Sequence, residues 1–411
     1  MSDVSITAEN KFISGAIKLT AGKSESNRAL MIRALCEDDF EIENLAIAKD
    51  TETMQRLLRS EGSVKDVGPA GTTMRFLTAL YASTPGEYLL TGSERMKNRP
   101  IKILVDALRE LGADIQYTEK EGCPPLKITG KTLTGGTVHM DGSVSSQYLS
   151  ALIMVGPTLK GGLNIVLEGK IASVPYLTMT LKLIALFGAE YTWEGNVIKI
   201  KEGKYQAQKY VIEADWSGAS YWYQIVALAQ TAEVKIIGLK KESLQGDAAI
   251  VEIFKKLGVE TQFLDNEIII KKNLNFHLPE KLVYDFSDCP DVAQTLASTV
   301  AGLGVEGHFT GLESLRIKET DRIQAIKNEL SKFSIDVDIL ADDEIVVKKG
   351  SLTETEGLIE TYDDHRVAMS IAPLCLLLDN ELKIKESEVV VKSYPDFWKD
   401  LNEVGLVSKV I

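Results

Sequence analysis

The sequence repeats itself, and this repetition limits the possible folds more than any other feature. From the second segment onward, the segment starts lie about 73 to 75 residues apart, and a fixed period indicates repeated supersecondary units. An ordinary α/β protein also begins its helices at intervals, but the near-constant spacing favours a repeat. Six segments begin with small, polar or acidic residues and continue into a helical apolar pattern, starting at Ala21, Gly68, Asp141, Ala214, Ser287 and Tyr362.

A second helix pattern follows within each unit, and short β-branched runs lie between the helices. Three glycines, Gly112, Gly188 and Gly258, stand where a left-handed residue ends a helix. The sequence therefore predicts an α/β fold of about six units, each with two helices and several short strands. The second helices are expected within residues 101–114, 176–190, 248–260 and 322–336, with weaker copies at 51–62 and 397–405, and strands at 197–200, 234–237, 267–270 and 344–347.

Length and composition indicate a folded protein of two or three domains. The chain has 411 residues, of which 45% are hydrophobic. Its four cysteines lie far apart with no C-x-x-C pair, which argues against a zinc site or a disulfide framework and fits a reducing compartment. The N-terminus shows no leader pattern, and the longest apolar stretch, residues 367–378, is shorter than the roughly 20 residues that span a bilayer. We expect a soluble, cytoplasmic protein that does not enter a membrane.

The charge of the chain excludes one class of partner. The formal net charge is −13, and an acidic chain is a poor general binder of nucleic acid. An anionic ligand would need a local basic cleft that overrides the global sign. Repeated helices that all open with small or polar residues aim several N-termini at one place, which suits anions.

Gly22-Lys23-Ser24 resembles part of a P-loop, but Ile17 stands where that motif requires glycine. Lys23, Ser24 and Arg28 lie within about one turn of a helix start and together could hold a carboxylate or phosphate. A solvated helix end with ordinary surface cations is the alternative.

A second cluster of polar residues opens the helix near residue 146. Ser145, Ser146 and Gln147 precede an apolar run, and their hydroxyl and backbone N–H groups could form a neutral phosphate cradle. Helix capping alone explains the same serines. The chain contains neither a G-x-S-x-G elbow nor a dinucleotide G-x-G-x-x-G after a strand, so a nucleophilic hydrolase and a Rossmann enzyme are not expected.

Two charged segments near the C-terminal end could bind anions. Lys318, Glu319 and Arg322 fall within one helical turn, so a carboxylate that the cations keep ionised could also move a proton. A surface ion-pair network explains these residues equally well. Arg366 leads into an apolar stretch, and buried arginine usually has an anionic partner. His365 has no second histidine at ligand spacing, so no metal is expected there.

Taken together, the motifs and their order resemble the 5-enolpyruvylshikimate-3-phosphate (EPSP) synthase family of enolpyruvyl transferases over essentially the whole chain. The resemblance implies six βαβαββ copies, three in each of two domains joined by a hinge. It places residues 1–21 and 215–411 in one domain and residues 22–214 in the other. The motifs are Ala21 to Ala29, Ala70 to Arg75, Arg95 to Ile101, Ser145 to Gln147, Pro290-Asp291, Arg316 to Arg322, Asp364 to Arg366, and Lys392.

The family transfers the enolpyruvyl group of phosphoenolpyruvate to the 5-hydroxyl of shikimate 3-phosphate and releases phosphate, on the route to chorismate and aromatic amino acids. The reaction proceeds by addition and elimination through a tetrahedral intermediate and uses no metal or organic cofactor. The resemblance also implies a monomer whose partners are these two small molecules. Catalysis would fall to Asp291, Glu319 and Lys23.

The binding residues that the resemblance implies form two overlapping sets. Asp291 would accept the hydroxyl proton, and Glu319 would protonate the methylene carbon. Shikimate 3-phosphate would be bound by Lys23, Ser24, Arg28, Ser145, Ser146, Gln147, Ser173, Tyr176, Asp291, Ser314 and Lys318. Phosphoenolpyruvate would be bound by Lys23, Gly71, Arg95, Gln147, Arg322, Arg366 and Lys392.

Two positions depart from the family pattern, and two other functions stay open. Pro69 and Ser314 stand where most or many members have asparagine. The sister transferase that acts on UDP-N-acetylglucosamine shares fold and donor, but it has Lys-Asn in place of Lys23-Ser24 and a catalytic cysteine in a mobile loop, whereas Cys123 lies in Gly-Cys-Pro-Pro. A non-catalytic anion-binding protein on the same scaffold is the other alternative, because fold does not fix function.

Overall fold

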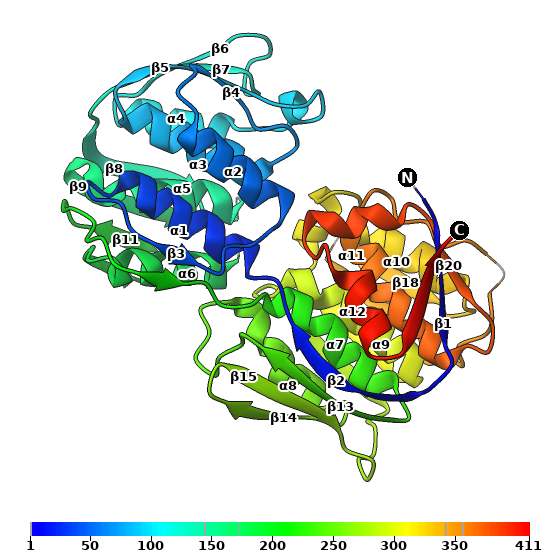
Figure 1. Cartoon of the computed structure of the whole chain (residues 1–411). Helices are drawn as coiled ribbons and strands as arrows, with labels where there is room; N and C mark the ends of the chain where they lie inside the picture. Colours follow the sequence, from blue (N-terminus) through cyan, green and yellow to red (C-terminus); the bar gives the residue numbers. More distant parts are fainter. Residues whose placement is uncertain (1, 144, 172, 342, 356) are drawn as a thin grey trace. The chain divides into compact units, whose positions relative to one another are not determined.

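The chain leaves its first compact unit after Ala21 and returns to it at Glu213. Unit 1 comprises Met1–Ala21 and Glu213–Ile411, and unit 2 comprises Gly22–Ile212 (Figure 1). The computed structural model describes residues 2–143, 145–171, 173–341, 343–355 and 357–411. Within this part of the chain, no helix is both long enough and apolar enough to cross a membrane.

Four sheets share one topology, two in each unit. In each, the first two strands pair in parallel and the last two form an antiparallel hairpin, whose second strand pairs with the second strand of the sheet. The orders are β4-β5-β7-β6 and β8-β9-β11-β10 in unit 2, and β2-β13-β15-β14 and β16-β17-β19-β18 in unit 1. This is the βαβαββ unit, and it confirms the α/β repeat.

The strands of these sheets are short, as the β-branched runs predicted. Predicted strands 197–200 and 344–347 are β11 and β19, and the other two lie inside β13 and β15. In unit 2 the strands are β4 (Val64–Asp66), β5 (Gly86–Thr91), β6 (Asp114–Tyr117), β7 (Leu126–Gly130), β8 (Thr134–Asp141), β9 (Lys160–Glu168), β10 (Tyr191–Glu194) and β11 (Val197–Ile200). In unit 1 they are β2 (Phe12–Lys18), β13 (Thr231–Ile237), β14 (Val259–Leu264), β15 (Glu267–Lys272), β16 (Lys281–Asp285), β17 (Glu306–Thr310), β18 (Val337–Ala341) and β19 (Glu344–Val347).

Each copy supplies one buried helix and one helix nearer the surface. The buried helices are α1 (Lys23–Leu35), α3 (Gly71–Ser83), α5 (Ser146–Val155), α7 (Trp216–Leu228), α9 (Ala293–Leu303) and α11 (His365–Ile371). The second helices are α2 (Lys49–Arg59), α4 (Lys102–Glu110), α6 (Val174–Leu186), α8 (Ile250–Lys255), α10 (Arg322–Ser331) and α12 (Phe397–Glu403). All six second helices overlap their predicted ranges, and each ends before the end of its range. Two of them, α2 and α6, begin two residues earlier than predicted.

In the first and last copies, a strand from a distant part of the chain pairs with the strands of the copy. In unit 2, β3 (Ile42–Glu43) pairs in parallel with β12 (Tyr210–Val211), which comes from the far end of that unit. In unit 1, β1 (Val4–Ala8) pairs antiparallel with β20 (Leu382–Ile384) and β21 (Leu406–Val410). The N-terminal strand therefore completes the last copy. The repeat that begins with β2 is also split, because all of unit 2 lies between β2 and α7.

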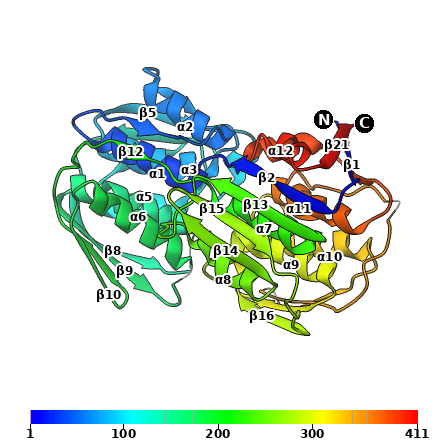
Figure 2. The ribbon, with the colours of Figure 1, turned by 60° about the horizontal axis from the view of Figure 1, so that its bottom comes forward.

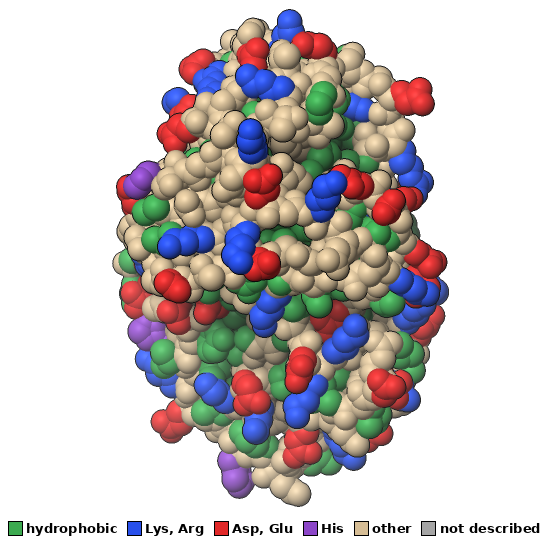
Figure 3. All heavy atoms as spheres, turned by 90° about the vertical axis from the view of Figure 1, so that its left-hand side faces the viewer, with side chains coloured by type: hydrophobic (Ala, Val, Ile, Leu, Met, Phe, Trp, Pro, Cys, Tyr) green, Lys and Arg blue, Asp and Glu red, His purple; other side chains and the backbone are tan. Residues whose placement is uncertain are grey.

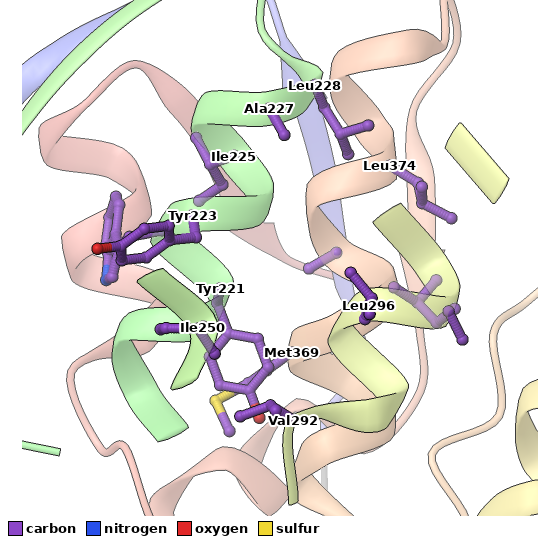
Figure 4. Close-up of a cluster of buried hydrophobic side chains, with 14 of the residues drawn as sticks. Tyr221, Tyr223, Ile225, Ala227, Leu228, Ile250, Val292, Leu296, Met369 and Leu374 are labelled. Atoms are coloured by element: carbon purple, nitrogen blue, oxygen red, sulfur yellow. The ribbon is translucent and has the colours of Figure 1, made fainter. Parts of the chain in front are cut away.

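The core of unit 1 lies between its sheets and around α7. Every residue of α7 is buried, from Trp216 to Leu228. Figure 4 shows apolar side chains of α7 lying against Ile250, Leu296, Met369 and Leu374 from four other segments. In Figure 2 the sheet of β2, β13, β15 and β14 covers α7 and α8. A helix apolar on all sides requires such a location, because burial of its side chains is the main favourable free-energy change.

Glycines end three of the second helices, as predicted. Gly112, Gly188 and Gly258 have φ angles of +92°, +88° and +81°. A residue with a Cβ is strained in this left-handed region, and glycine is not. These glycines therefore let the chain turn from the helix into the following hairpin.

Replacing Gly112 by alanine should lower the free energy of unfolding by about 1 kcal/mol. The reason is backbone strain alone, because no atom beyond the neighbouring residues of the chain lies within 4 Å of the Cβ position at Gly112. Gly203→Ala is the matched control, since Gly203 also has open space but no positive φ. Urea unfolding of both variants measures the difference; equal stabilities would contradict the strain argument.

Candidate active site

In unit 1, the charged residues predicted near the C-terminal end gather around one buried guanidinium. Arg322 is the first residue of α10 and is 2% exposed. Its Nε lies 2.7 Å from Asp364 Oδ2, its Nη1 3.0 Å from Asp291 Oδ1 and its Nη2 2.9 Å from Glu319 Oε2. A buried cation is tolerated only when such partners replace its hydration. Arg322 therefore fixes three carboxylates from three different segments.

Arg366 and Lys318 complete the surroundings of Asp291. Arg366 Nη2 lies 3.3 Å from Asp291 Oδ2, and its Nη1 donates to the backbone oxygen of Asp291 at 3.1 Å. Lys318 Nζ lies 3.6 Å from Asp291 Oδ1. Asp291 belongs to η4 (Pro290–Val292), a single turn that leads directly into α9. The carboxylate of Asp291 thus lies among three cations, just before the start of a helix.

Glu319 is the second carboxylate of this cluster. Lys392 Nζ lies 2.5 Å from its Oε1, and Arg322 holds its other oxygen. Burial by itself would raise the pKa of Glu319, but the charges of Arg322 and Lys392 outweigh burial and hold the pKa far below its ordinary value. Glu319 is therefore ionised while no other anion is bound.

Short polar residues at the helix starts hold this cluster in position. The side chain of Asp364 accepts from the N–H of Arg366 at 2.9 Å and caps α11. Asp321 caps α10 by accepting from the N–H of Gln324 at 3.1 Å. These caps satisfy N–H groups that the helices leave free, so they set where each helix begins and where its first side chains point.

Ser314 lies in η5 (Glu313–Ile317), which runs up to Lys318. Its hydroxyl is buried and has no hydrogen-bond partner among the described residues. Such an unpartnered hydroxyl is uncommon in a folded protein, where buried polar atoms usually have a hydrogen-bond partner.

In unit 2, Arg28 is held by other side chains. The guanidinium is 2% exposed and donates to Thr180 Oγ1 at 2.7 Å, to Ser150 Oγ at 2.9 Å and to the backbone oxygen of Ser24 at 2.9 Å. Burial lowers its pKa to about 10, so the group stays charged at neutral pH. It also lies over the ring of Tyr176, with 5.9 Å to the centroid. Arg28 thus links three helices beside two other predicted residues.

Lys23 begins α1 and faces α2. Its Nζ lies 3.7 Å from Asp50 Oδ2, and Asp50 is 8% exposed. The sequence did not single out Asp50 as the partner of Lys23, because the two residues approach each other only when α1 and α2 pack. An ion pair at this distance restrains the lysine side chain. The ammonium group has three N–H donors, so it can still donate hydrogen bonds to other groups.

The start of α5 meets the start of α3. Ser145 Oγ accepts from the N–H of Gln147 at 3.4 Å, which is the predicted cap. Gln147 Nε2 donates to Thr72 Oγ1 at 3.1 Å, so Gln147 and Gly71 lie at adjoining helix N-termini. Ser146 is the first residue of α5, and Ser173 precedes α6 with a φ of +55°. Free N–H groups at such helix starts favour anions.

Arg99 is a residue that the sequence argument missed. A Cβ added at Gly71 would lie 2.7 Å from Arg99 Nη1, so the guanidinium of Arg99 rests against this glycine. Arg95, which was predicted for anion binding, is exposed, whereas Arg99 is half-buried. Both arginines belong to the same motif. Their exposure and the close approach of Arg99 to Gly71 distinguish them, and neither can be read from the sequence.

The structure thus gathers the predicted residues of unit 1 into one cluster. In unit 2 it joins Arg28 to Ser24 and Tyr176, and it places Gln147 beside the helix start that contains Gly71. Within the part of the chain that the structure describes, no three His, Cys, Asp or Glu residues are grouped as a metal site would require. The unit 1 cluster contains Asp291, Lys318, Glu319, Arg322, Arg366 and Lys392, with Ser314 in the adjacent turn. The predicted residues of unit 2 are Lys23, Ser24, Arg28, Gly71, Arg95, Ser145, Ser146, Gln147, Ser173 and Tyr176.

Comparison with known proteins identifies the family. The sequence profile of EPSP synthase (3-phosphoshikimate 1-carboxyvinyltransferase) matches residues 7–65 and 60–401. The chain belongs to the EPSP synthase family. A 3-phosphoshikimate 1-carboxyvinyltransferase of Bacteroides fragilis (strain YCH46) is 47% identical over 403 residues, covering 97% of each chain. One from Colwellia psychrerythraea is 37% identical over 423 residues, covering 96% of this chain and 97% of the relative.

Solved structures agree with the fold. An EPSP synthase from Acinetobacter baumannii superposes with a TM-score of 0.81 at 23% identity and covers 100% of both chains. The resemblance drawn from the motifs is therefore confirmed at the level of family and fold.

Replacing Asp364 by asparagine should lower the free energy of unfolding by about 3 kcal/mol, because it removes a buried partner of Arg322. Glu306→Gln is the control: it breaks a surface pair in the same unit, with Lys281 at 3.2 Å, and should change stability by less than about 1 kcal/mol. Urea unfolding monitored by tryptophan fluorescence compares them. Similar losses for both variants would mean that Arg322 does not depend on Asp364.

Proposed function

We propose that this member of the EPSP synthase family transfers the enolpyruvyl group of phosphoenolpyruvate to the 5-hydroxyl of shikimate 3-phosphate and releases phosphate. The observation that carries the proposal is the cluster of Lys318, Arg322, Arg366 and Lys392 around Asp291 and Glu319, in a chain whose net charge is −13. On the face drawn in Figure 3, Lys and Arg side chains are interspersed with Asp and Glu. In this cluster, four cations meet around the two carboxylates Asp291 and Glu319. Two polyanionic substrates require such a concentration.

In the addition step, Asp291 takes the proton of the 5-hydroxyl group while that oxygen forms a bond to C2 of phosphoenolpyruvate. Glu319, once protonated, donates its proton to the methylene carbon, which becomes a methyl group. In the elimination step, the bond from C2 to the phosphate oxygen breaks. Glu319 takes a proton back from the methyl group, and the proton held by Asp291 leaves with phosphate. No net proton is produced, and both carboxylates return to their starting state.

Glu319 must gain a proton before it can act as an acid. Arg322 and Lys392 keep it ionised in the free protein. Bound anions neutralise these cations and add negative charge nearby, and both effects raise the pKa of a carboxyl group. We propose that substrate binding itself prepares Glu319 as the acid.

The residues of unit 2 would bind the same substrates. We propose that Ser145, Ser146, Ser173 and Tyr176 hold the phosphate of shikimate 3-phosphate beside Lys23 and Ser24. Arg28 would support that phosphate by ordering Ser24 and Tyr176, in addition to its predicted direct contact. Gln147 and Gly71 would face phosphoenolpyruvate with Lys23.

We propose that Arg99 binds phosphoenolpyruvate in unit 2, a role predicted for Arg95. Support comes from its position against Gly71 and from its partial burial, which leaves less competing water. Arg322, Arg366 and Lys392 would bind phosphoenolpyruvate from unit 1, and Ser314 and Lys318 would contact the shikimate hydroxyls.

We propose a cytoplasmic monomer that does not bind nucleic acid. The net charge of −13 argues against nucleic-acid binding, and the four free cysteines fit a reducing compartment. The monomer follows from the family resemblance alone.

Incubation with both phosphorylated substrates, followed by measurement of released phosphate, tests the activity. Release with shikimate 3-phosphate is expected. Release only with UDP-N-acetylglucosamine would instead select the sister transferase, which the family assignment does not favour. No release with either acceptor would leave an anion-binding protein.

Replacing Glu319 by glutamine should lower turnover by about 100-fold or more, because glutamine has no proton to donate to the methylene carbon. Binding of shikimate 3-phosphate should change little. Glu329→Gln is the control, since Glu329 is also buried, lies on α10 and pairs with Lys332 at 2.7 Å. Turnover near the normal rate in the Glu319 variant would remove the proposed acid.

Replacing Arg99 by glutamine should raise the half-saturation concentration of phosphoenolpyruvate by about tenfold or more, the loss expected for one charge-assisted hydrogen bond. Arg95→Gln, in the same motif, should change it by less than about threefold. Initial rates at saturating shikimate 3-phosphate measure both. The opposite ranking would return the role to Arg95.

A further inference from the structure

Asp247 is linked through Ser217 to Arg366, a residue proposed to bind phosphoenolpyruvate, and it takes no part in the proposed reaction steps. It belongs to η3 (Gly246–Ala249) and is 6% exposed. The hydroxyl of Ser217 donates a hydrogen bond to Asp247 Oδ2. Arg366 Nη2 donates to Ser217 Oγ at 3.3 Å and lies at the same distance from Asp291 Oδ2. A hydrogen-bond chain thus runs from Arg366 through Ser217 to Asp247.

The charged groups that face Asp247 come from several elements. Asp291 faces it from η4, Arg366 from α11, and Asp215 from the residue that caps α7. The thiol of Cys289, just before η4, also lies near it. The helix that follows, α8, keeps its own charged side chains, Glu252 and Lys255, exposed. Arg366 is thus the cation among the facing groups named here, and Asp247, Asp291 and Asp215 share its charge.

Burial, and next the charge of Asp291, raise the pKa of Asp247 to about 7, although Arg366 and the Ser217 hydroxyl favour the ionised form. Near neutral pH the free protein is then a mixture of protonated and ionised Asp247. An anion that binds to Arg366 adds negative charge close to Asp247 and favours its neutral form.

We propose that Asp247 is a positioning residue that takes up a proton when Arg366 binds phosphoenolpyruvate. Neutral Asp247 no longer attracts Arg366, so the positive charge of Arg366 acts on the substrate. This inference rests on the proposed function, because it takes Arg366 as a ligand of that substrate. Proton uptake and affinity are linked, so the protonated protein must bind the anion more tightly. The substrate would therefore bind best below about pH 7 and lose affinity as the pH rises.

The pH dependence of half-saturation for phosphoenolpyruvate, at saturating shikimate 3-phosphate, tests the inference. Between pH 6 and pH 8 the wild-type value should rise by about tenfold. In Asp247→Asn, which mimics the neutral carboxyl, that rise should be absent. The second ionisation of the substrate phosphate, near pH 6, affects every variant equally.

Asp400→Asn is the matched control. Asp400 is also 6% exposed, lies in the same unit and accepts a hydrogen bond from a hydroxyl group, that of Tyr394 at 2.5 Å. This variant should keep the wild-type pH profile. Calorimetric titration with phosphoenolpyruvate at pH 7.5, in buffers of different ionisation heat, should show uptake of about half a proton more in wild type than in Asp247→Asn.

An Asp247→Asn profile that matches wild type would overturn the inference, as would equal proton uptake. If that variant does not fold, Ser217→Ala decides. Loss of the hydroxyl removes a donor that favours ionised Asp247, so the rise in half-saturation should move to higher pH. An unmoved profile would again overturn the inference. Failure of the wild-type protein to release phosphate at any pH would instead overturn the proposed function, so the two failures are distinguishable.

Discussion

The unit 1 site depends on the burial of one guanidinium group. Arg322 reaches Asp291, Glu319 and Asp364, which come from three separate stretches of the chain. None of these carboxylates could be packed so close to the others without the cation between them, because like charges at such distances repel strongly in a medium poorer in water than the solvent. The fold brings these residues together, because η4, α10 and α11 all contact α9. The geometry of the proposed base and acid thus follows from one arginine.

The sequence predicted the repeat because each copy uses local signals that do not depend on its neighbours. Asp364 and Asp321 stand before helices as caps, and Gly188 follows a helix as its stop. Pairing between distant segments leaves no such local signal. The sequence could not predict that β1 pairs with β21 or that β12 pairs with β3. A strand of two to five β-prone residues has many possible partners.

The same difference between local signals and contacts of distant segments explains which site residues the sequence predicted and which it missed. Glu319 and Arg322 were recognised because they are three residues apart, and they do form an ion pair. The helical turn predicted for Lys318, Glu319 and Arg322 is wrong, because α10 begins only at Arg322, after the cap Asp321. Arg99 was missed because its contact with Gly71 joins segments that meet only in the fold. Asp247 carried no motif, and its significance lies in a hydroxyl group from another helix and an arginine from a third. Arg28 was singled out from its motif, but its hydrogen bonds to Thr180 and Ser150 could not be foreseen because they require packed helices.

Charge balance connects the proposed acid with Asp247. The cluster sets Lys318, Arg322, Arg366 and Lys392 against Asp247, Asp291, Glu319 and Asp364, so it is close to neutral when every group is ionised. A phosphorylated substrate makes such a site net negative, and the free-energy cost falls if a carboxylate takes up a proton. Two carboxylates are suited to do so: Glu319, whose cations the substrate neutralises, and Asp247, whose pKa already lies near 7. In the proposed reaction, the first proton is the one needed at the methylene carbon. The second would leave Arg366 free for the anion, so the same rule of charge balance would govern both binding and chemistry.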